Sequence, residues 1–169
     1  TGSIGKTLLN IVNKDYKKFE IILLSANKDY KTLIAQAKKF KVKKIIITNE
    51  NSFKIAKNKY SKSNIEIFNS FENLNRIIKK KIDYTMSSII GIDGLDPTLK
   101  IIKFTKKIAI ANKESIVCGW KLILKELKKY NTEFVPVDSE HFSLWYAMNN
   151  FKSNQIENFF LTASGGPFY

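Results

Sequence analysis

Short apolar runs alternate with amphipathic segments along this chain, and this alternation is the feature that most restricts its fold. Runs with strand character lie at 19–24, 45–47, 65–68, 84–90, 108–111, 134–137 and 159–162. Segments with helical spacing lie at 30–40, around 53–56, and at 70–80, 98–104, 115–130 and 142–148. Short runs that are apolar throughout are typical of parallel strands buried on both faces. The pattern predicts an α/β fold with a doubly wound, mostly parallel sheet.

The first residues indicate which kind of α/β domain this is. The chain opens Thr1-Gly2-Ser3-Ile4-Gly5 and then shows helical apolar spacing. Two glycines three apart at the start of a helix form the second half of the loop that binds pyrophosphate in dinucleotide folds. We therefore expect a Rossmann-like domain over 1–150. The strand that should precede this loop is missing and there is no initiator Met, so we expect a fragment truncated at both ends, in which 151–169 begins a catalytic and dimerisation domain.

The end of the second strand of such a fold distinguishes NADPH from NADH. Folds specific for NAD usually carry an acidic residue there, which binds the ribose 2′-hydroxyl. Here the strand ends Leu24-Ser25-Ala26-Asn27-Lys28, and an amide followed by a cation suits a 2′-phosphate. Asp29 comes one residue later and weakens this argument, and Lys28 could also be an ordinary exposed lysine. The pattern favours NADPH.

A second set of polar residues follows the apolar run 134–137, in the sequence Asp138-Ser139-Glu140-His141. Residues two apart in extended backbone project to the same side, so Asp138 and Glu140 are expected to reach one cation together. Carboxylate oxygens prefer Mg²⁺ or Mn²⁺ to Zn²⁺, and sites in open α/β sheets lie at the carboxyl ends of strands. The alternative interpretation is a solvated surface turn, with His141 in a structural role.

The net charge of +14 raises the possibility of nucleic-acid binding. However, Arg76 is the only arginine among 29 basic residues, and the lysines are spread over nearly every expected helix. Arginine is the residue that reads bases and phosphates in bidentate fashion, so we expect no nucleic-acid partner. The single cysteine, Cys118, suits a reducing compartment and is expected to be a small core residue. No segment is apolar for long enough to span a membrane, so we expect a cytoplasmic protein without a membrane partner.

Four motifs together resemble one family, the 1-deoxy-D-xylulose 5-phosphate reductoisomerases. They are Thr1-Gly2-Ser3-Ile4-Gly5, Ala111-Asn112-Lys113-Glu114-Ser115-Ile116-Val117, Pro136-Val137-Asp138-Ser139-Glu140-His141 and Thr162-Ala163-Ser164-Gly165-Gly166-Pro167-Phe168. The resemblance implies NADPH-dependent rearrangement and reduction of 1-deoxy-D-xylulose 5-phosphate to 2-C-methyl-D-erythritol 4-phosphate, in non-mevalonate isoprenoid biosynthesis. It also implies Mg²⁺ or Mn²⁺, with Co²⁺ as a further candidate, a sugar phosphate substrate and a homodimer in the bacterial cytoplasm. Turnover by the fragment alone is not expected.

The resemblance also implies roles for individual residues. Lys113 and Glu140 would be catalytic, and Asp138 and Glu140 would bind the metal. The substrate would be bound by Lys113, Ser139, Glu140 and Ser164. NADPH would be bound by Thr1, Gly2, Ser3, Ile4, Asn27, Lys28, Asp29, Asn112 and Glu114. The third metal carboxylate of the family is expected further along the longer protein.

Two other classes of protein remain open on the residues themselves. One is a different NADP-dependent oxidoreductase, of the homoserine or semialdehyde dehydrogenase type, and the other is a basic nucleic-acid-binding domain. The Asp138-Ser139-Glu140-His141 element argues against the first, because that type lacks a comparable element. The scarcity of arginine argues against the second.

Overall fold

A computed structural model of the chain describes residues 1–149, 151 and 155–160. Helices and strands alternate along these residues. The strands are β1 (Leu24–Ala26), β2 (Lys44–Ile47), β3 (Glu66–Phe68), β4 (Ile82–Ser87), β5 (Thr105–Ile110) and β6 (Glu133–Pro136). The α-helices are α1 (Ser3–Lys14), α2 (Tyr30–Lys39), α3 (Glu50–Lys59), α4 (Leu74–Ile77), α5 (Leu95–Ile102), α6 (Lys113–Tyr130) and α7 (Ser139–Met148). Two short 3₁₀ turns, η1 (Tyr16–Lys18) and η2 (Ile92–Gly94), complete the order.

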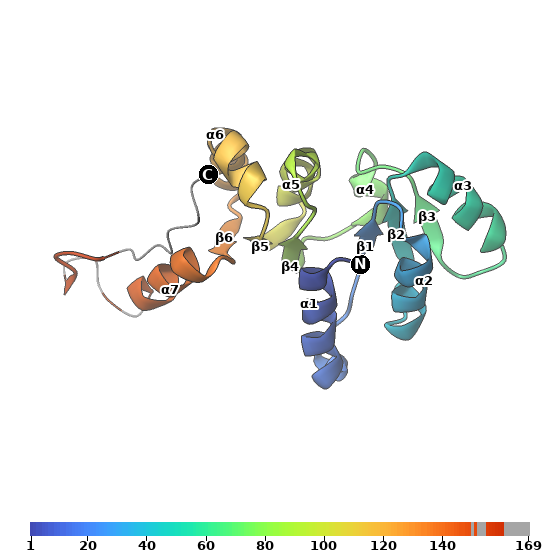
Figure 1. The fold of residues 1–169 in the computed structure, drawn as a ribbon, viewed down its shortest axis with the longest axis horizontal. Helices are drawn as coiled ribbons and strands as arrows, with labels where there is room; N and C mark the ends of the chain where they lie inside the picture. The colour runs from blue at the N-terminus through green and yellow to red at the C-terminus, as the bar shows by residue number, and fades with distance from the viewer. Residues whose placement is uncertain (150, 152–154, 161–169) are drawn as a thin grey trace, which may run out of the picture.

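All of the strand pairs are parallel, which confirms the predicted α/β class with a parallel sheet. The strands form two three-stranded sheets, in the orders β1-β2-β3 and β4-β5-β6. In the first, Leu24 is opposite Ile45, and in the second, Ile108 is opposite Phe134. The two sheets extend in opposite directions from the region between β1 and β4, where α1 also lies (Figure 1). This arrangement places the point at which the strand order reverses between β1 and β4.

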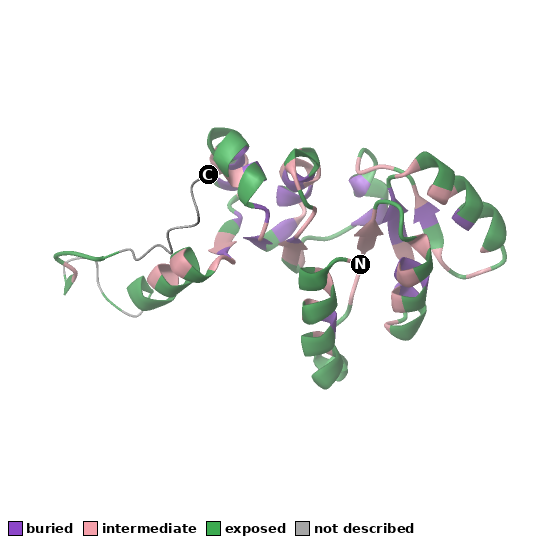
Figure 2. Ribbon diagram, viewed as in Figure 1, coloured by how far each residue is buried: buried purple, intermediate pink, exposed green. Residues whose placement is uncertain are grey.

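Helices lie on both sides of the strands, as a doubly wound fold requires. Figure 1 shows α1 and α2 on one side and α5 and α6 on the other. The buried residues lie mainly on the strands and on the helix faces turned toward them (Figure 2). One apolar core joins the two sheets, because Ile46 of β2 belongs to the same cluster as Ile108 and Ile110 of β5. Burial of this shared cluster keeps the carboxyl ends of both sheets in a fixed relation.

Most of the helices begin near the predicted residues, but α4 is much shorter than the expected helix at 70–80. The chain becomes extended at Ile78, directly after α4. The Lys44 ammonium donates a hydrogen bond to the Ile77 carbonyl oxygen at 2.8 Å, which occupies a carbonyl that a continuing helix would use. Leu74, Ile77 and Ile78 are buried. Tertiary contacts therefore override the local helical pattern.

Two strand boundaries and one cysteine also differ from expectation. Strand β1 begins at Leu24 rather than at residue 19, because only residues 24–26 pair with β2. Strand β4 ends at Ser87, and the residues after it form a loop. Cys118 is exposed rather than buried, because α6 buries the face that carries Gly119 and Ile123. The strand expected at 159–162 falls partly outside the described residues, and its described part is not a strand.

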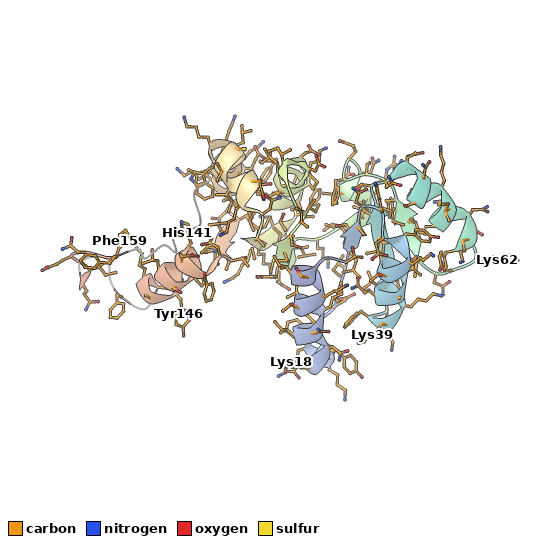
Figure 3. The ribbon with its side chains drawn as sticks, viewed as in Figure 1. Lys18, Lys39, Lys62, His141, Tyr146 and Phe159 are labelled. Carbon is orange, nitrogen blue, oxygen red and sulfur yellow. The ribbon has the colours of Figure 1, made fainter. Side chains whose placement is uncertain are left out.

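The lysines are spread over the molecule, in agreement with the sequence pattern. Figure 3 shows Lys18 at the foot of α1, Lys39 at the end of α2 and Lys62 beyond α3, each extending away from the strands. In the part of the chain that the structure describes, no helix combines the length and the apolar character needed to cross a membrane.

Two helical glycines provide a test of the packing between α5 and α6. A Cβ on Gly119 would overlap Leu95 of α5, with its Cδ2 atom at 2.9 Å, whereas a Cβ on Gly5 in α1 would have nothing within 4 Å. We expect Gly119→Ala to lower the free energy of unfolding by about 1–2 kcal/mol, because overpacking outweighs the gain in helix propensity. Gly5→Ala should raise it by up to about 1 kcal/mol. Chemical denaturation of both variants measures this difference. An equal change in the free energy of unfolding would contradict the close packing of Gly119 against Leu95.

Candidate functional site

Four of the five predicted groups of site residues lie in the described part of the chain, and three of these follow the carboxyl ends of strands. Residues 27–29 follow β1, residues 112–114 follow β5, and residues 138–140 follow β6. The fourth group, residues 1–4, opens α1, which lies between the two sheets (Figure 1). Because the strands are parallel, these segments lie along one edge of the fold. This edge includes the point where the strand order reverses, the position at which open α/β sheets bind ligands.

The first turn of α1 is suited to bind an anion. Gly2 is the N-cap residue in extended conformation, and within the described part of the chain no side chain caps this helix. The Gly2 carbonyl oxygen accepts a hydrogen bond from the Lys6 N–H at 2.9 Å. The earlier N–H groups of the helix remain to be satisfied by solvent or by a ligand. A 12-residue helix with an uncapped amino end offers both donors and a favourable dipole to a phosphate.

The segment after β1 presents one cation and one carboxylate with different roles. The Asp29 carboxylate caps α2 and accepts a hydrogen bond from the Thr32 N–H at 3.1 Å. Hydrogen bonds from the Thr32 side chain and backbone lower the pKa of Asp29, and the positive charges of the Thr1 amino group and Lys6 add to this. The Asp29 carboxylate therefore lies near the first residues of α1. Lys28 is exposed beside it.

The segment after β5 begins with a buried side chain and continues with two exposed ones. Asn112 is 4% exposed, and its Oδ1 accepts a hydrogen bond from the Ser115 N–H at 2.8 Å, so it caps α6. Lys113 and Glu114 occupy the exposed first turn of that helix. The N-terminal position of Glu114 is favourable for its charge, whereas that of Lys113 is not. A lysine held at an unfavourable helix position is consistent with a role outside helix stability.

The segment after β6 places Asp138 and Glu140 at the start of α7. Asp138 is the N-cap residue, and its Oδ1 accepts the His141 N–H at 3.0 Å and lies 2.6 Å from His141 Nδ1. The Ser139 hydroxyl donates to Glu140 Oε2 at 2.8 Å. The prediction that both carboxylates lie on extended backbone is wrong, because Glu140 lies within the helix. Asp138 turns the chain into α7 as its cap, which is why the helix begins three residues before the expected position.

The ammonium of Lys113, which follows β5, affects the carboxylates that follow the neighbouring strand β6. Burial raises the pKa of Asp138, but the hydrogen bonds from the His141 backbone and ring and the charge of Lys113 outweigh it, so the pKa is lowered. The pKa of Glu140 is lowered by the Ser139 hydrogen bond, and Lys113 adds to this while Asp138 opposes it. Both carboxylates are therefore ionised at neutral pH, beside one ammonium group. Within the described residues, no group of three or more His, Cys, Asp or Glu residues could hold a metal ion.

One segment of this edge was missed by the sequence analysis. The loop 88–94 follows β4, and Gly91 in it has a φ of +75°. Ile90 in this loop is 84% exposed. Gly91 and Gly94 have the same three-residue separation as Gly2 and Gly5, so the spacing could have drawn attention to this loop.

Comparison with known proteins decides between the protein classes left open by the residues. A family model described as 1-deoxy-D-xylulose 5-phosphate reductoisomerase matches residues 1–119, and a model of the C-terminal domain of the same enzyme matches residues 134–169. The chain belongs to the 1-deoxy-D-xylulose 5-phosphate reductoisomerase family.

Individual reductoisomerases are similar over nearly the whole chain. The enzyme of Pelagibacter ubique is 58% identical over 99% of the chain, and that of Clostridium botulinum (strain Loch Maree / Type A3) is 36% identical over 99%. The chain spans 44% of the length of each of these relatives.

Solved reductoisomerase structures share the fold as well as the sequence. The Zymomonas mobilis enzyme in complex with NADPH has a TM-score of 0.75 and 33% identity, covering 83% of this chain and 37% of its own. A reductoisomerase in complex with NADPH, fosmidomycin and magnesium has a TM-score of 0.75 and 30% identity, covering 83% of this chain and 35% of its own.

Some predictions from the reductoisomerase resemblance stay predictions. Ser164 lies outside the described residues, and so does most of the last motif. The expected boundary between 1–150 and 151–169 is also untested. The described part of the candidate site consists of the α1 amino end and the segments after β1, β5 and β6, and the roles expected for its residues also stay predictions.

Proposed function

We propose that this chain is the cofactor-binding part, together with the start of the catalytic part, of a longer 1-deoxy-D-xylulose 5-phosphate reductoisomerase. The whole enzyme would convert 1-deoxy-D-xylulose 5-phosphate to 2-C-methyl-D-erythritol 4-phosphate with NADPH and a divalent cation. It would act as a homodimer in the bacterial cytoplasm. One observation carries the proposal: an uncapped helix terminus and a coupled group of Lys113, Asp138 and Glu140 lie at the same edge of one fold.

The residues of this chain fit NADPH in two places. The free N–H groups of the first turn of α1 would bind the pyrophosphate, and Gly2, with nothing within 4 Å of a built Cβ, leaves room for it. Lys28 would pair with the 2′-phosphate of the adenosine, while the Asp29 carboxylate caps α2. NADPH supplies a hydride to the substrate when it is bound. The protein binds and orients the cofactor at this edge.

The residues also fit a divalent cation, on the chemistry of the donor set. Asp138 and Glu140 offer ionised oxygens two residues apart in sequence, and each is already oriented by one neighbour, His141 or Ser139. Hard oxygen ligands of this kind suit Mg²⁺ or Mn²⁺. Such an ion supplies electrostatic stabilisation to negative charge on substrate oxygens. Further ligands would come from the longer protein.

Lys113 is the residue of this chain that we assign to direct contact with the substrate. Its ammonium lies close enough to influence the pKa of Asp138 and of Glu140, which supports a role for Lys113 at the same centre. A lysine at this position can donate a hydrogen bond to a substrate oxygen and neutralise its charge. Ser139, exposed at the start of α7, and Ser164 would add hydrogen bonds to the substrate.

The proposed function is tested by the cofactor and ion requirements of the whole enzyme. NADPH should be oxidised only when 1-deoxy-D-xylulose 5-phosphate and Mg²⁺ or Mn²⁺ are both present, as followed by the loss of NADPH absorbance. A chelator should stop the reaction, and added metal should restore it. NADPH oxidation that proceeds equally well without the sugar phosphate, or in the presence of the chelator, would overturn the proposal.

The cofactor preference provides a separate prediction for Lys28. Lys28→Ala in the whole enzyme should lower kcat/KM for NADPH by roughly 10-fold or more, the effect of losing one charge-assisted hydrogen bond. The kcat/KM for NADH should stay nearly unchanged, since NADH lacks the 2′-phosphate. Lys39→Ala, at the far end of α2, serves as the matched control. An equal loss with both cofactors would show that Lys28 does not contact the 2′-phosphate.

A further inference from the structure

The Asn112 side chain joins two segments of the site by hydrogen bonds. Its Oδ1 caps α6 by accepting the Ser115 N–H at 2.8 Å. Its Nδ2 donates to the Gly91 carbonyl oxygen at 2.6 Å and to the Ile89 carbonyl oxygen. Both amide hydrogens and the amide oxygen are therefore engaged within the protein. The side chain connects the loop 88–94 with the first turn of α6.

The loop is also held from the side of α5. The Thr98 hydroxyl donates to the Gly94 carbonyl oxygen at 2.6 Å and lies 2.6 Å from the Ser87 hydroxyl. Gly94 lets Asn112 approach closely, because a Cβ there would overlap Asn112 Nδ2 and lie 2.6 Å from the Ile89 carbonyl oxygen. The loop is thus tied at both ends to buried polar groups.

The position of the loop gives this connection a functional meaning. It follows β4, and Asn112 follows β5, the hydrogen-bonded neighbour of β4 in the second sheet. β4 borders the point where the strand order reverses. The Ile90 side chain in this loop is 84% exposed, so burial of that side chain does not explain how the loop is held in place. Lys113 and Glu114, which directly follow Asn112 in the first turn of α6, are both assigned to the site.

We propose that Asn112 is a positioning residue, which fixes the loop 88–94 and the first turn of α6 as one unit so that Ile90, Lys113 and Glu114 face the ligands in a set arrangement. The inference rests on the proposed reductoisomerase function and adds a role that is different from direct contact with the cofactor. The loop is placed before any ligand binds, because its hydrogen bonds come from the chain itself. Preorganisation of this kind lowers the cost of aligning the reacting groups.

The test compares Asn112→Asp with a matched control, Asn49→Asp, in the whole enzyme. Asn49 is also an N-cap residue, and its Oδ1 accepts the Ser52 N–H at 3.0 Å on α3. Aspartate caps a helix as well as asparagine does, so both variants keep their caps. At position 112 the change also removes the hydrogen bonds donated to the Ile89 and Gly91 carbonyl oxygens and places a carboxylate against them.

Two measurements decide the result. Without ligand, backbone amides of residues 88–94 in Asn112→Asp should exchange with solvent roughly 10-fold faster than in the parent, whereas Asn49→Asp leaves them unchanged. With substrates, kcat should fall by roughly 10-fold to 100-fold. KM for NADPH should change much less, because the contacts at α1 and β1 are intact. Unchanged exchange in the loop would overturn the proposal, and so would faster exchange with unchanged kcat.

A second variant reaches the loop without touching Asn112. Gly91→Ala forces an alanine into a φ of +75°, which is strained even though the space is open. It should give the same pattern of faster loop exchange and lower kcat with the cap of α6 retained. A normal kcat in Gly91→Ala despite a loosened loop would overturn the positioning role. If the parent enzyme does not turn over the sugar phosphate, the proposed function fails, while loop exchange still reports on the Asn112 connection.

Discussion

Replacing Glu140 with glutamine in the whole enzyme should remove nearly all metal-dependent turnover. We expect kcat/KM to fall by roughly 100-fold or more, since even groups that only orient metal ligands contribute about 10-fold to 100-fold. Glutamine keeps the size of the side chain but removes the negative charge that a hard cation requires. Titration with Mn²⁺ should show weaker binding of the ion in the same variant. Asp138→Asn should behave similarly while keeping the cap of α7, because asparagine is an equally good N-cap residue.

The matched control for Glu140→Gln is Glu50→Gln. Glu50 also lies in the first turn of a helix, but it is exposed and pairs with Lys54 at 3.3 Å on α3. Its replacement changes the same charge at a helix amino end, far from the proposed ion. Equal effects of the two substitutions on activity, or Mn²⁺ binding that is unchanged by Glu140→Gln, would contradict the assignment of Glu140 as a ligand.

Lys113→Met should reduce kcat/KM by roughly 100-fold to 1,000-fold, the effect of removing one donor from a charged reaction centre. Methionine preserves much of the apolar stem, so the variant isolates the ammonium group. The pKa of Glu140 and of Asp138 should rise, because the positive charge of Lys113 contributes to lowering both. Their ionised forms would then be lost at a higher pH, so activity of the variant should decline earlier on acidification than activity of the parent.

Lys121→Met is the matched control for Lys113. Lys121 is exposed on the same helix, two turns further along. Its substitution should leave turnover within about 2-fold, since exposed lysines contribute little energy by themselves. A similar loss for both lysines would indicate a general effect of net charge on the binding of a phosphorylated substrate, rather than a contact made by Lys113.

The alternation of apolar runs was sufficient to predict the class of fold, because short runs that are apolar throughout are typical of parallel strands buried on both faces. The site was harder to predict. The charge of Asp138 affects the pKa of Glu140, but the argument that both lie on extended backbone was wrong, because Asp138 caps α7 and Glu140 lies within that helix. Capping by Asp138 involves His141, which follows three residues later and was assigned only a structural role.

The parts that the sequence did not predict depend on contacts between distant residues. The early end of α4 follows from Lys44, which is 33 residues away along the chain. The connection between Asn112 and the loop 88–94 joins residues 21 and 23 apart. No local pattern contains such information, because a single asparagine before a helix predicts a cap and nothing about its two amide hydrogens. These groups come together only when the whole chain folds.

The contact between Asp138 and His141 has a consequence for how tightly the proposed cation would bind. One carboxylate oxygen of Asp138, Oδ1, accepts a hydrogen bond from the His141 backbone N–H and lies within hydrogen-bond distance of its ring Nδ1. Rotation of the Asp138 side chain is therefore already restricted. An ion bound by Asp138, as proposed, would meet a carboxylate whose torsional freedom was lost when the helix formed, so little conformational entropy would oppose chelation. His141 would thereby raise the affinity for the proposed ion without binding it directly.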